Sequence, residues 1–309
     1  ALPACPGAWF LHHVGMAPAP LPFDLRPLDG LSDDDLREAL GATFSDYLVP
    51  VRFDDREALA QFLRRQGVDL TLSMGAFRPD APQLLGVVLL APQWKASPPW
   101  MRLATMGIRP EARGLGVARP LLSAAIASAW SLGAEEMRLE VFAQNARALA
   151  LYTAMGFKPL HRLYGYELEL AQDAIADCPI PIPNRLDAST AQQWLQARQP
   201  QDQAFQMSAS MVPLLPPDTL FWQSGQALLA GREPLPGQVT VSIAVDRSTG
   251  SADLQNLIRH WAFAAGPAPI HRFTVPALQA EHTGAVAWEM LGAERSPLFQ
   301  WQMAMKRPA

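Results

Sequence analysis

The sequence predicts an α/β fold, because strand-like and helix-like apolar patterns alternate along the chain. An extended run at residues 101–108 precedes a glycine-containing turn, and a stretch with a helical apolar period then reaches Trp130. A strand with a period of two at 137–142 and a second helical pattern that ends at Gly156 follow. The 309 residues, of which 49% are hydrophobic, are enough to form two cores. We therefore expect two α/β units.

The turn between the first strand and the first helix, Arg113–Ala118, is typical of a phosphate site. Gly114 and Gly116 lack a Cβ, so the backbone there can take a positive φ and approach a bulky anion closely. Pro120 fits only within the first helical turn, which places the helix start at about residue 116 or 117. Unpaired N–H groups and the helix dipole then favour an anion at this point. The alternative is a tight loop whose arginine is solvated.

The second helical pattern carries polar groups on one face. Asn145, Ala148, Leu149 and Tyr152 are spaced by three and four residues and therefore lie on the same side of a helix. Two plainer explanations exist for this pattern. Asn145 can simply cap its helix, and Tyr152 can be an ordinary half-buried aromatic residue.

At these residues the chain resembles the GNAT N-acetyltransferase superfamily. The family signature is Arg or Gln, two residues, Gly, one residue, then Gly or Ala, and Arg113, Gly116 and Ala118 match it. A second family segment, an Asn after a strand followed by Leu-Tyr and Gly-Phe, is similar to residues 145–157. The resemblance spans about residues 70–170. It implies a mixed, mostly antiparallel central sheet flanked by helices.

The resemblance also implies acetyl-CoA as the cofactor. In the family, the pyrophosphate lies on the backbone amides of the turn, and the pantetheine arm lies along the preceding strand, which a bulge splays from the next strand. The residues that this assigns to cofactor binding are Met106, Gly107, Ile108, Arg113, Gly114, Leu115, Gly116, Val117, Ala118, Asn145, Ala148 and Tyr152.

Acetyl transfer to an amine requires proton handling at both ends of the reaction. An amine with a pKa of about 10 must lose a proton before it attacks, and a thiol with a pKa of about 8.5 leaves more easily when it is protonated. Tyr152 matches the family tyrosine that acts on the sulfur. Glu140 is the candidate base, although a strand carboxylate between apolar neighbours is more often solvent-facing. Asp46 and Tyr47 are weaker candidates for this role.

The chain is expected to divide at a proline-rich segment. Alternate prolines force an extended conformation and predict a linker at 173–184. The linker separates an acetyltransferase domain at 23–172 from a second domain at 185–309, and residues 1–22 are expected to form a flexible leader.

The second domain is expected to be a degenerate copy of the first. Arg247–Ala252 repeats the Arg-x-x-Gly-x-Ala form of the first turn and follows an apolar strand. Trp288 stands where the first copy has its phenol, and an indole N–H does not transfer protons in this pH range. Gln279 or His282 falls near the position of Asn145. We therefore expect the second domain to cover the first or to wall its acceptor site, as in tandem members of the family, and not to catalyse. Whether it binds CoA stays open.

Composition limits the partners. A net charge of −4 without a basic run disfavours nucleic acid and anionic membranes, and no apolar run approaches the ~18 residues of a spanning helix. Cys5 and Cys178 imply no disulfide framework, so a reducing cytoplasm is the expected location. No metal site is expected, because the His12–His13 pair lacks further ligands at a suitable spacing.

The acceptor is expected to enter over the first helices. Asp33, Asp34, Asp35 and Asp46 could attract a cationic amine, but an acidic first helical turn is more often a solvated face that interacts with the helix dipole. Small amines and protein amino groups both remain open as acceptors. The sequence thus favours an acetyl-CoA-dependent N-acetyltransferase that acts by direct transfer in a ternary complex. The alternatives are a CoA-binding sensor or structural protein without catalysis, and a transferase of another acyl group.

Overall fold

The computed structural model describes most of the chain, namely residues 22–79, 81, 83–94, 96–171, 182–198, 203–264 and 270–308. Nearly all of the predicted leader, most of the predicted linker, the His12–His13 pair and both cysteines lie outside these residues. Within the described residues, no helix has the length and apolar character needed to cross a bilayer.

The described elements confirm the predicted α/β class. The first half contains β1 (Asp24–Pro27), α1 (Asp33–Thr43), α2 (Arg56–Gln66), β2 (Asp69–Phe77), β3 (Leu84–Gln93), β4 (Trp100–Ile108), η1 (Pro110–Ala112), α3 (Ala118–Ser131), β5 (Glu136–Phe142), α4 (Ala146–Ala154) and β6 (Lys158–Ala171). The second half contains β7 (Asn184–Leu186), α5 (Ala188–Arg198), η3 (Phe205–Met207), η4 (Ala209–Leu214), β8 (Leu220–Ser224), β9 (Ala227–Leu235), β10 (Gln238–Asp246), η5 (Thr249–Ser251), α6 (Ala252–Ala264), β11 (Ile270–Ala280), η6 (Glu281–Ala285), α7 (Val286–Met290), β12 (Glu294–Arg295) and β13 (Gln300–Lys306).

Local chemistry explains where the first helices begin and end. The Ser32 side chain caps α1 by accepting from the Asp35 N–H at 3.2 Å, and three aspartates in the first turn complement the helix dipole. This confirms the simpler interpretation of that acidic run. Asp55 caps α2 in the same way, and Gly67, with a φ of 66°, ends it in the left-handed conformation.

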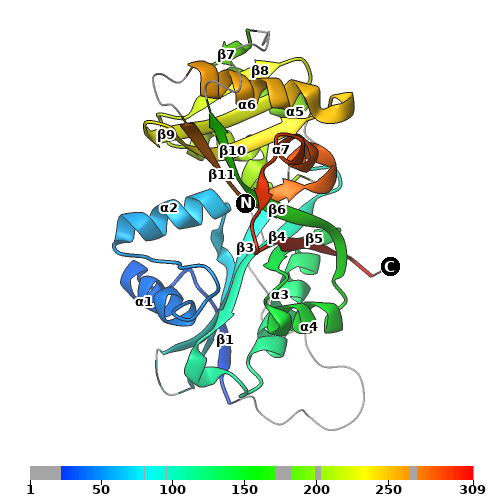
Figure 1. Cartoon of the computed structure of the whole chain (residues 1–309). Coiled ribbons are helices and arrows are strands. Elements are labelled where there is room, and N and C mark those ends of the chain that lie inside the picture. The colour runs from blue at the N-terminus through cyan, green and yellow to red at the C-terminus, as the bar shows by residue number, and fades with distance from the viewer. Residues whose placement is uncertain are drawn as a thin grey trace.

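The sheet of the first half separates two pairs of helices. In Figure 1, α1 and α2 lie on one side of the sheet, and α3 and α4 lie on the other. Alternate strand residues such as Met101, Met137 and Leu139 are buried in a core shared with α3. The opposite face of the same strands carries Arg102 and Glu140, so the side chains of these two residues point toward the α1 and α2 side.

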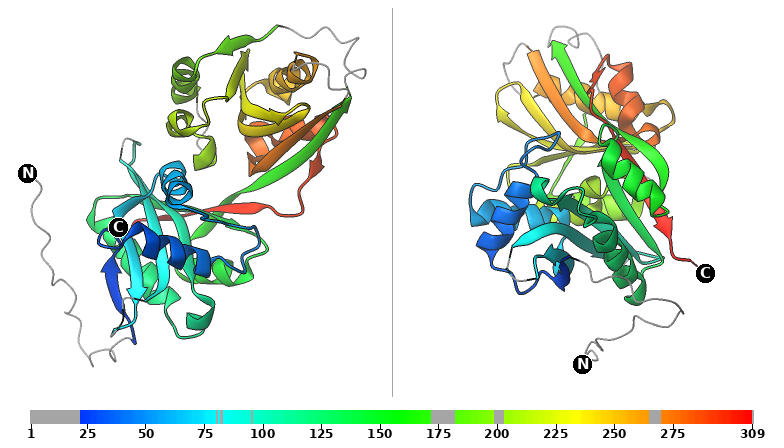
Figure 2. Two further views of the ribbon diagram at one scale, coloured as in Figure 1. Left: turned by 90° about the vertical axis from the view of Figure 1, so that its left-hand side faces the viewer. Right: turned by 90° about the horizontal axis from the view of Figure 1, so that it is seen from below.

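The two halves exchange strands. The order of the sheet is β1-β2-β3-β4-β5-β13-β6-β11-β10-β9-β8-β7, so the last strand of the chain lies between two strands of the first half. Gln302 pairs with Glu140 on one side and with His161 on the other. The first part of β6 pairs with β13 and the second part with β11, so β6 runs through both halves (Figure 2). The sequence ranges 23–172 and 185–309 therefore do not each contain a complete sheet.

The second half repeats the order of elements in the first, as its second Arg-x-x-Gly-x-Ala segment predicts. β10, α6 and β11 follow one another as β4, α3 and β5 do. In both cases the two strands are parallel neighbours. The spatial arrangement thus supports an internal duplication, although β13 and β6 cross between the copies.

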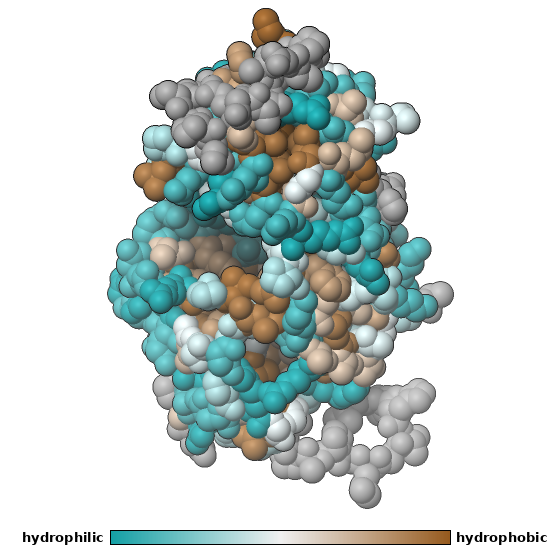
Figure 3. Space-filling model, in the orientation of Figure 1, coloured by the Kyte–Doolittle hydropathy of each residue, from teal (hydrophilic) through white to brown (hydrophobic). Residues whose placement is uncertain are grey.

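A segment of the second half packs directly on the first. The ring of Phe205 lies under the Arg102 guanidinium at 4.8 Å, and a Cβ at Gly67 would lie 3.0 Å from the same ring. Figure 3 shows that the surface is hollowed where the two halves meet, with hydrophobic residues at the edge of the hollow. The second half therefore walls the α1 and α2 side of the first sheet.

Exchange of β13 gives a stability prediction. Met303 lies near the end of the chain but is 1% exposed in the core of the first half, so Met303→Ala should lower the free energy of unfolding by ~2–5 kcal/mol. Met290→Ala, at a 61% exposed position, should change it by less than about 0.5 kcal/mol. Chemical denaturation measures both. An equally small effect for the two variants would contradict the position of β13.

Candidate active site

The candidate site begins where β4 and β5 separate. These strands pair in parallel only from Trp100 with Glu136 to Leu103 with Leu139. A shift in the pairing of β3 with β4, at Leu89 and Leu90, leaves Ala104 as an extra residue in β4. The expected bulge and splay are therefore present. Past the bulge, Met106–Ile108 pair with β3 on one side only, so their other edge has no strand partner, and we call the region between this edge and β5 the slot.

The turn after β4 has the predicted geometry. Gly114 and Gly116 have φ values of 81° and 77°, which favour glycine, and a Cβ at either position would meet no atom within 4 Å. α3 begins at Ala118, and no side chain among the described residues caps it. Pro120 lies within its first turn, as expected. We call the turn Arg113–Ala118 the cradle. The first N–H groups of α3 lie at this turn, where Gly114 and Gly116 leave open space.

The Arg113 side chain is held by protein groups. It donates from Nε to the Ile108 carbonyl at 3.1 Å and binds both carboxylate oxygens of Asp46, one of them at 2.8 Å. The hydrogen bond from Arg113 lowers the pKa of Asp46. The Arg113 side chain is therefore not simply solvated, as the alternative interpretation of the turn had it, and Asp46 is already paired with an arginine.

Asn145 and Tyr152 belong to α4, which follows the end of β5. The Asn145 side chain caps α4 by accepting from the Ala148 N–H at 3.2 Å, so the capping interpretation is correct. Tyr152 is 6% exposed and packs edge-to-face on Phe157 with centroids 5.9 Å apart. Burial, with a smaller contribution from Tyr47, raises the pKa of Tyr152. The phenol therefore stays protonated at neutral pH and has a proton to donate in a hydrogen bond.

Glu140 is buried in an ion pair. The Arg102 Nε and Nη2 atoms lie 2.9 and 2.8 Å from its Oε2, and the two side chains are 2% and 4% exposed. The expectation of a solvent-facing carboxylate is therefore wrong. Arg102 also donates to the Gln66 side chain at 2.8 Å. Both bonds from Arg102 end on Oε2, which reduces the capacity of Glu140 as a base. Its role as a base stays a prediction, and the ion pair argues against it.

Sequence reasoning missed Arg102. The signal was present, because Arg102 alternates with apolar Met101 and Leu103 and so must share a sheet face with the even-numbered residues of β5. A buried arginine requires an acidic partner, and β5 offers two acids at even-numbered positions, Glu136 and Glu140, between which the pattern does not decide.

The turn of the second half is filled by its own chain. Asp246 is 5% exposed, and its carboxylate accepts from the Ser248 N–H at 2.6 Å and from the Leu254 N–H at 2.9 Å. Gly250 keeps a positive φ of 78°. The carboxylate thus takes N–H groups that are uncapped in the first half, which disfavours a second anion here.

The remaining candidates in the second half are also enclosed. Trp288 is fully buried beside Phe273, and Gln279 is 1% exposed with its amide against the Met207 sulfur. The side chain of His282 lies outside the described residues. These contacts support the prediction that this half does not catalyse.

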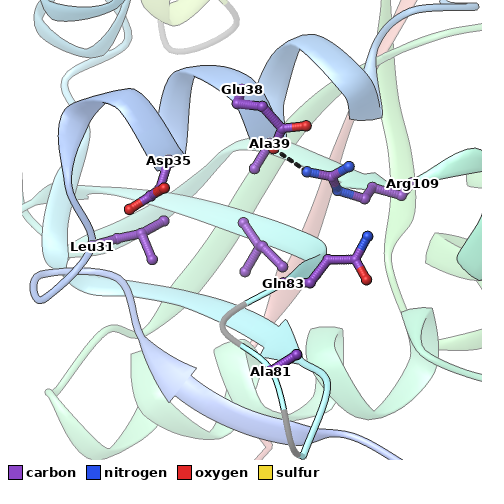
Figure 4. Close-up of a pocket in the computed structure, with 8 residues that line it drawn as sticks. Leu31, Asp35, Glu38, Ala39, Ala81, Gln83 and Arg109 are labelled. Atoms are coloured by element: carbon purple, nitrogen blue, oxygen red, sulfur yellow. Dashed lines mark hydrogen bonds and ion pairs between the residues drawn. The ribbon is translucent and has the colours of Figure 1, made fainter.

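Two other hollows lie away from the slot. One of about 300 Å³ lies beside α1, and its lining includes Glu38 and Arg109, which form an ion pair (Figure 4). The other, of about 800 Å³, lies over the outer ends of β5, β13 and β6 and is lined by Lys158 and Lys306. The ion pair in the first hollow links α1 to the end of β4.

Comparison with known proteins agrees with this geometry. Residues 34–157, which include the bulge, the cradle and α4, match the acetyltransferase (GNAT) family. This segment of the chain therefore carries an acetyltransferase (GNAT) domain. A mycothiol acetyltransferase of Jonesia denitrificans is 40% identical over 72 residues, which are 22% of this chain and 23% of that relative.

Solved structures resemble nearly the whole of this chain. A GCN5-related N-acetyltransferase from Sphaerobacter thermophilus is 15% identical with a TM-score of 0.57, over 94% of this chain and 98% of that one. A GCN5-related N-acetyltransferase from Anabaena variabilis is 13% identical with a TM-score of 0.62, over 91% and 72% of the respective chains. Sequence identities this low show a shared fold alone, and the aligned regions include both halves of this chain.

The buried ion pair gives the second prediction. Arg102→Met leaves the Glu140 carboxylate buried without its partner and should lower the free energy of unfolding by ~3–5 kcal/mol. The double variant Arg102→Met/Glu140→Leu should recover much of this loss, because no buried charge remains. Denaturant titration of both variants tests this. Additive losses would show that the two side chains are not coupled.

Proposed function

We propose that this protein is an acetyl-CoA-dependent N-acetyltransferase that transfers the acetyl group to a primary amine by direct transfer in a ternary complex. The observation that carries the proposal is the continuity of the slot with the cradle. The free edge of Met106–Ile108 leads to the uncapped start of α3, where Gly114 and Gly116 leave open space. An extended chain with a diphosphate at one end fits this shape.

Acetyl-CoA supplies an activated acetyl group as a thioester. The residues of the chain that would hold it are the β4 edge, the amides of Arg113–Ala118, and the Asn145, Ala148 and Tyr152 face of α4. In the transfer, a bond forms between the amine nitrogen and the acetyl carbon, and the bond between carbon and sulfur breaks. The amine proton leaves to a base or to water, and the sulfur receives a proton.

Tyr152 is the proposed donor to the sulfur. Its raised pKa means that the hydroxyl keeps its proton even at pH 10, the ordinary pKa of a phenol. Such a phenol supplies a hydrogen bond to the developing thiolate throughout the pH range in which amines become deprotonated. We propose a water-linked base on the amine side, because Glu140 is committed to Arg102.

The acceptor is proposed to be a small-molecule amine or a protein amino group that enters from the α1 and α2 side. The similar enzyme of Jonesia denitrificans carries mycothiol in its name, but the short match covers too little of either chain to assign that acceptor here. The wall made by Phe205 narrows this side of the sheet.

Replacement of the phenol tests the chemistry. Tyr152→Phe removes one hydroxyl and keeps the ring, so turnover should fall by about 100-fold while the affinity for acetyl-CoA changes by less than about threefold. Tyr164→Phe is the matched control. The Tyr164 hydroxyl in β6 donates to Glu281 in the wild type, and its loss should leave the activity unchanged. Acetylation of an amine panel measures turnover, and calorimetry measures affinity. Cofactor binding without acetylation of any amine would favour a CoA-binding protein instead.

Two matched glycine variants test the cradle. Gly116→Glu adds bulk and negative charge in front of the α3 amides and should abolish acetyl-CoA binding. Gly250→Glu places the same side chain at a similar φ in the second half, where Asp246 already fills the turn, and should leave one binding site intact. Calorimetric stoichiometry reports both. Two sites in the wild type would contradict the filled turn, and no site would contradict the proposed function.

A further inference from the structure

A short segment after α1 connects both sides of the slot. We call Phe44–Tyr47 the strap. Its ring pair, Phe44 and Tyr47, packs edge-to-face at 5.4 Å, and the Tyr47 N–H donates to the Phe44 carbonyl at 3.1 Å. The strap is therefore a tight turn that a hydrogen bond and a ring contact close.

One end of the strap is fixed to β4 and to the cradle. A Cβ at Gly107 would lie 2.1 Å from the Thr43 side chain and 3.1 Å from the Phe44 ring, so the end of α1 lies directly on β4. Asp46 forms its two-oxygen ion pair with Arg113, which also donates toward the Thr43 carbonyl at 3.4 Å. Arg109 forms an ion pair with Glu38, which lies earlier in α1 than Thr43 (Figure 4).

The other end of the strap is fixed to β5 and α4. The Tyr47 ring lies 6.2 Å from that of Phe142, the last residue of β5. Its hydroxyl lies beside the Asn145 side chain, whose hydrogen bond partly offsets the rise in the pKa of Tyr47 that burial causes. The strap therefore spans the ends of two strands that have stopped pairing with each other.

From these contacts we propose that the strap is a latched roof over the pantetheine arm, with Asp46 as a positioning residue that keeps the roof closed. The inference rests on the proposed function, because it takes the slot to be the cofactor site. The Asp46 and Arg113 side chains are 56% and 32% exposed. Exposed ion pairs are weak, so this latch can open for the cofactor and close again.

The latch explains why the Arg113 side chain binds groups of the protein rather than a ligand. Its guanidinium links the Ile108 carbonyl, the end of α1 and the strap, and its backbone belongs to the cradle. Occupation of the cradle and closure of the roof thus share one residue. A cofactor that orders the cradle also orders the anchor of the roof.

The dissociation rate of CoA tests the proposal. Asp46→Ala opens the latch and should speed CoA dissociation by about three- to fivefold in stopped-flow measurements, with an unchanged melting temperature because the side chain is exposed. Asp46→Glu keeps the carboxylate and should stay near the wild-type rate. Asp34→Ala is the matched control, because Asp34 also pairs with an arginine through both oxygens in an exposed position, and it should not change the rate.

Three outcomes would overturn parts of this scheme separately. If the wild type binds CoA and Asp46→Ala releases it at the same rate as Asp34→Ala, the strap is not a roof and the proposed function stands. If the wild type binds neither CoA nor acetyl-CoA, the proposed function itself fails. A rate that rises equally in Asp46→Glu would show that the ion pair is not the latch.

Discussion

The separation of β4 from β5 is the constraint on which the rest of the site depends. Two parallel strands that pair for four residues and then diverge leave backbone groups without partners, and such groups must be satisfied by water, side chains or a ligand. The bulge at Ala104 causes the divergence. The cradle lies at the open end of the gap, Tyr152 and Asn145 lie on the β5 side, and the strap lies across it.

The second half shows what happens when the same scaffold is not kept open. Its strands repeat the parallel pairing, but Asp246 satisfies the helix start and Met207 packs against Gln279. Each of these groups replaces a contact that a ligand could make. In the described part of the chain, no side chain caps the helix start at the cradle of the first half. This difference separates the two turns more clearly than their glycines, since glycines with a positive φ occur in both.

Much of this arrangement could be predicted from the sequence, because local rules governed it. The limits of β4, α3, β5 and α4 follow from periodicity, from Pro120 and from the glycines, and the repeated order of strand, helix and strand follows from the second Arg-x-x-Gly-x-Ala segment. The contacts of Arg113 and Glu140 could not be predicted in this way. Their partners, Asp46 and Arg102, lie 67 and 38 residues away, and the sequence does not specify which charged groups meet across a sheet. The exchange of β13 was missed for the same reason, because strand patterns do not name their neighbours.

The strand exchange also determines the order in which the molecule can fold. Glu136 pairs with Lys306, so the sheet of the first half is incomplete until the last strand has been synthesised. Until then, β5 and β6 expose edges to solvent and to other chains. Contacts between such distant residues slow folding, because a long loop must close before they contribute stability. The sheet that positions the site in the first half is therefore complete only after β13 has been synthesised, and its assembly depends on the second half.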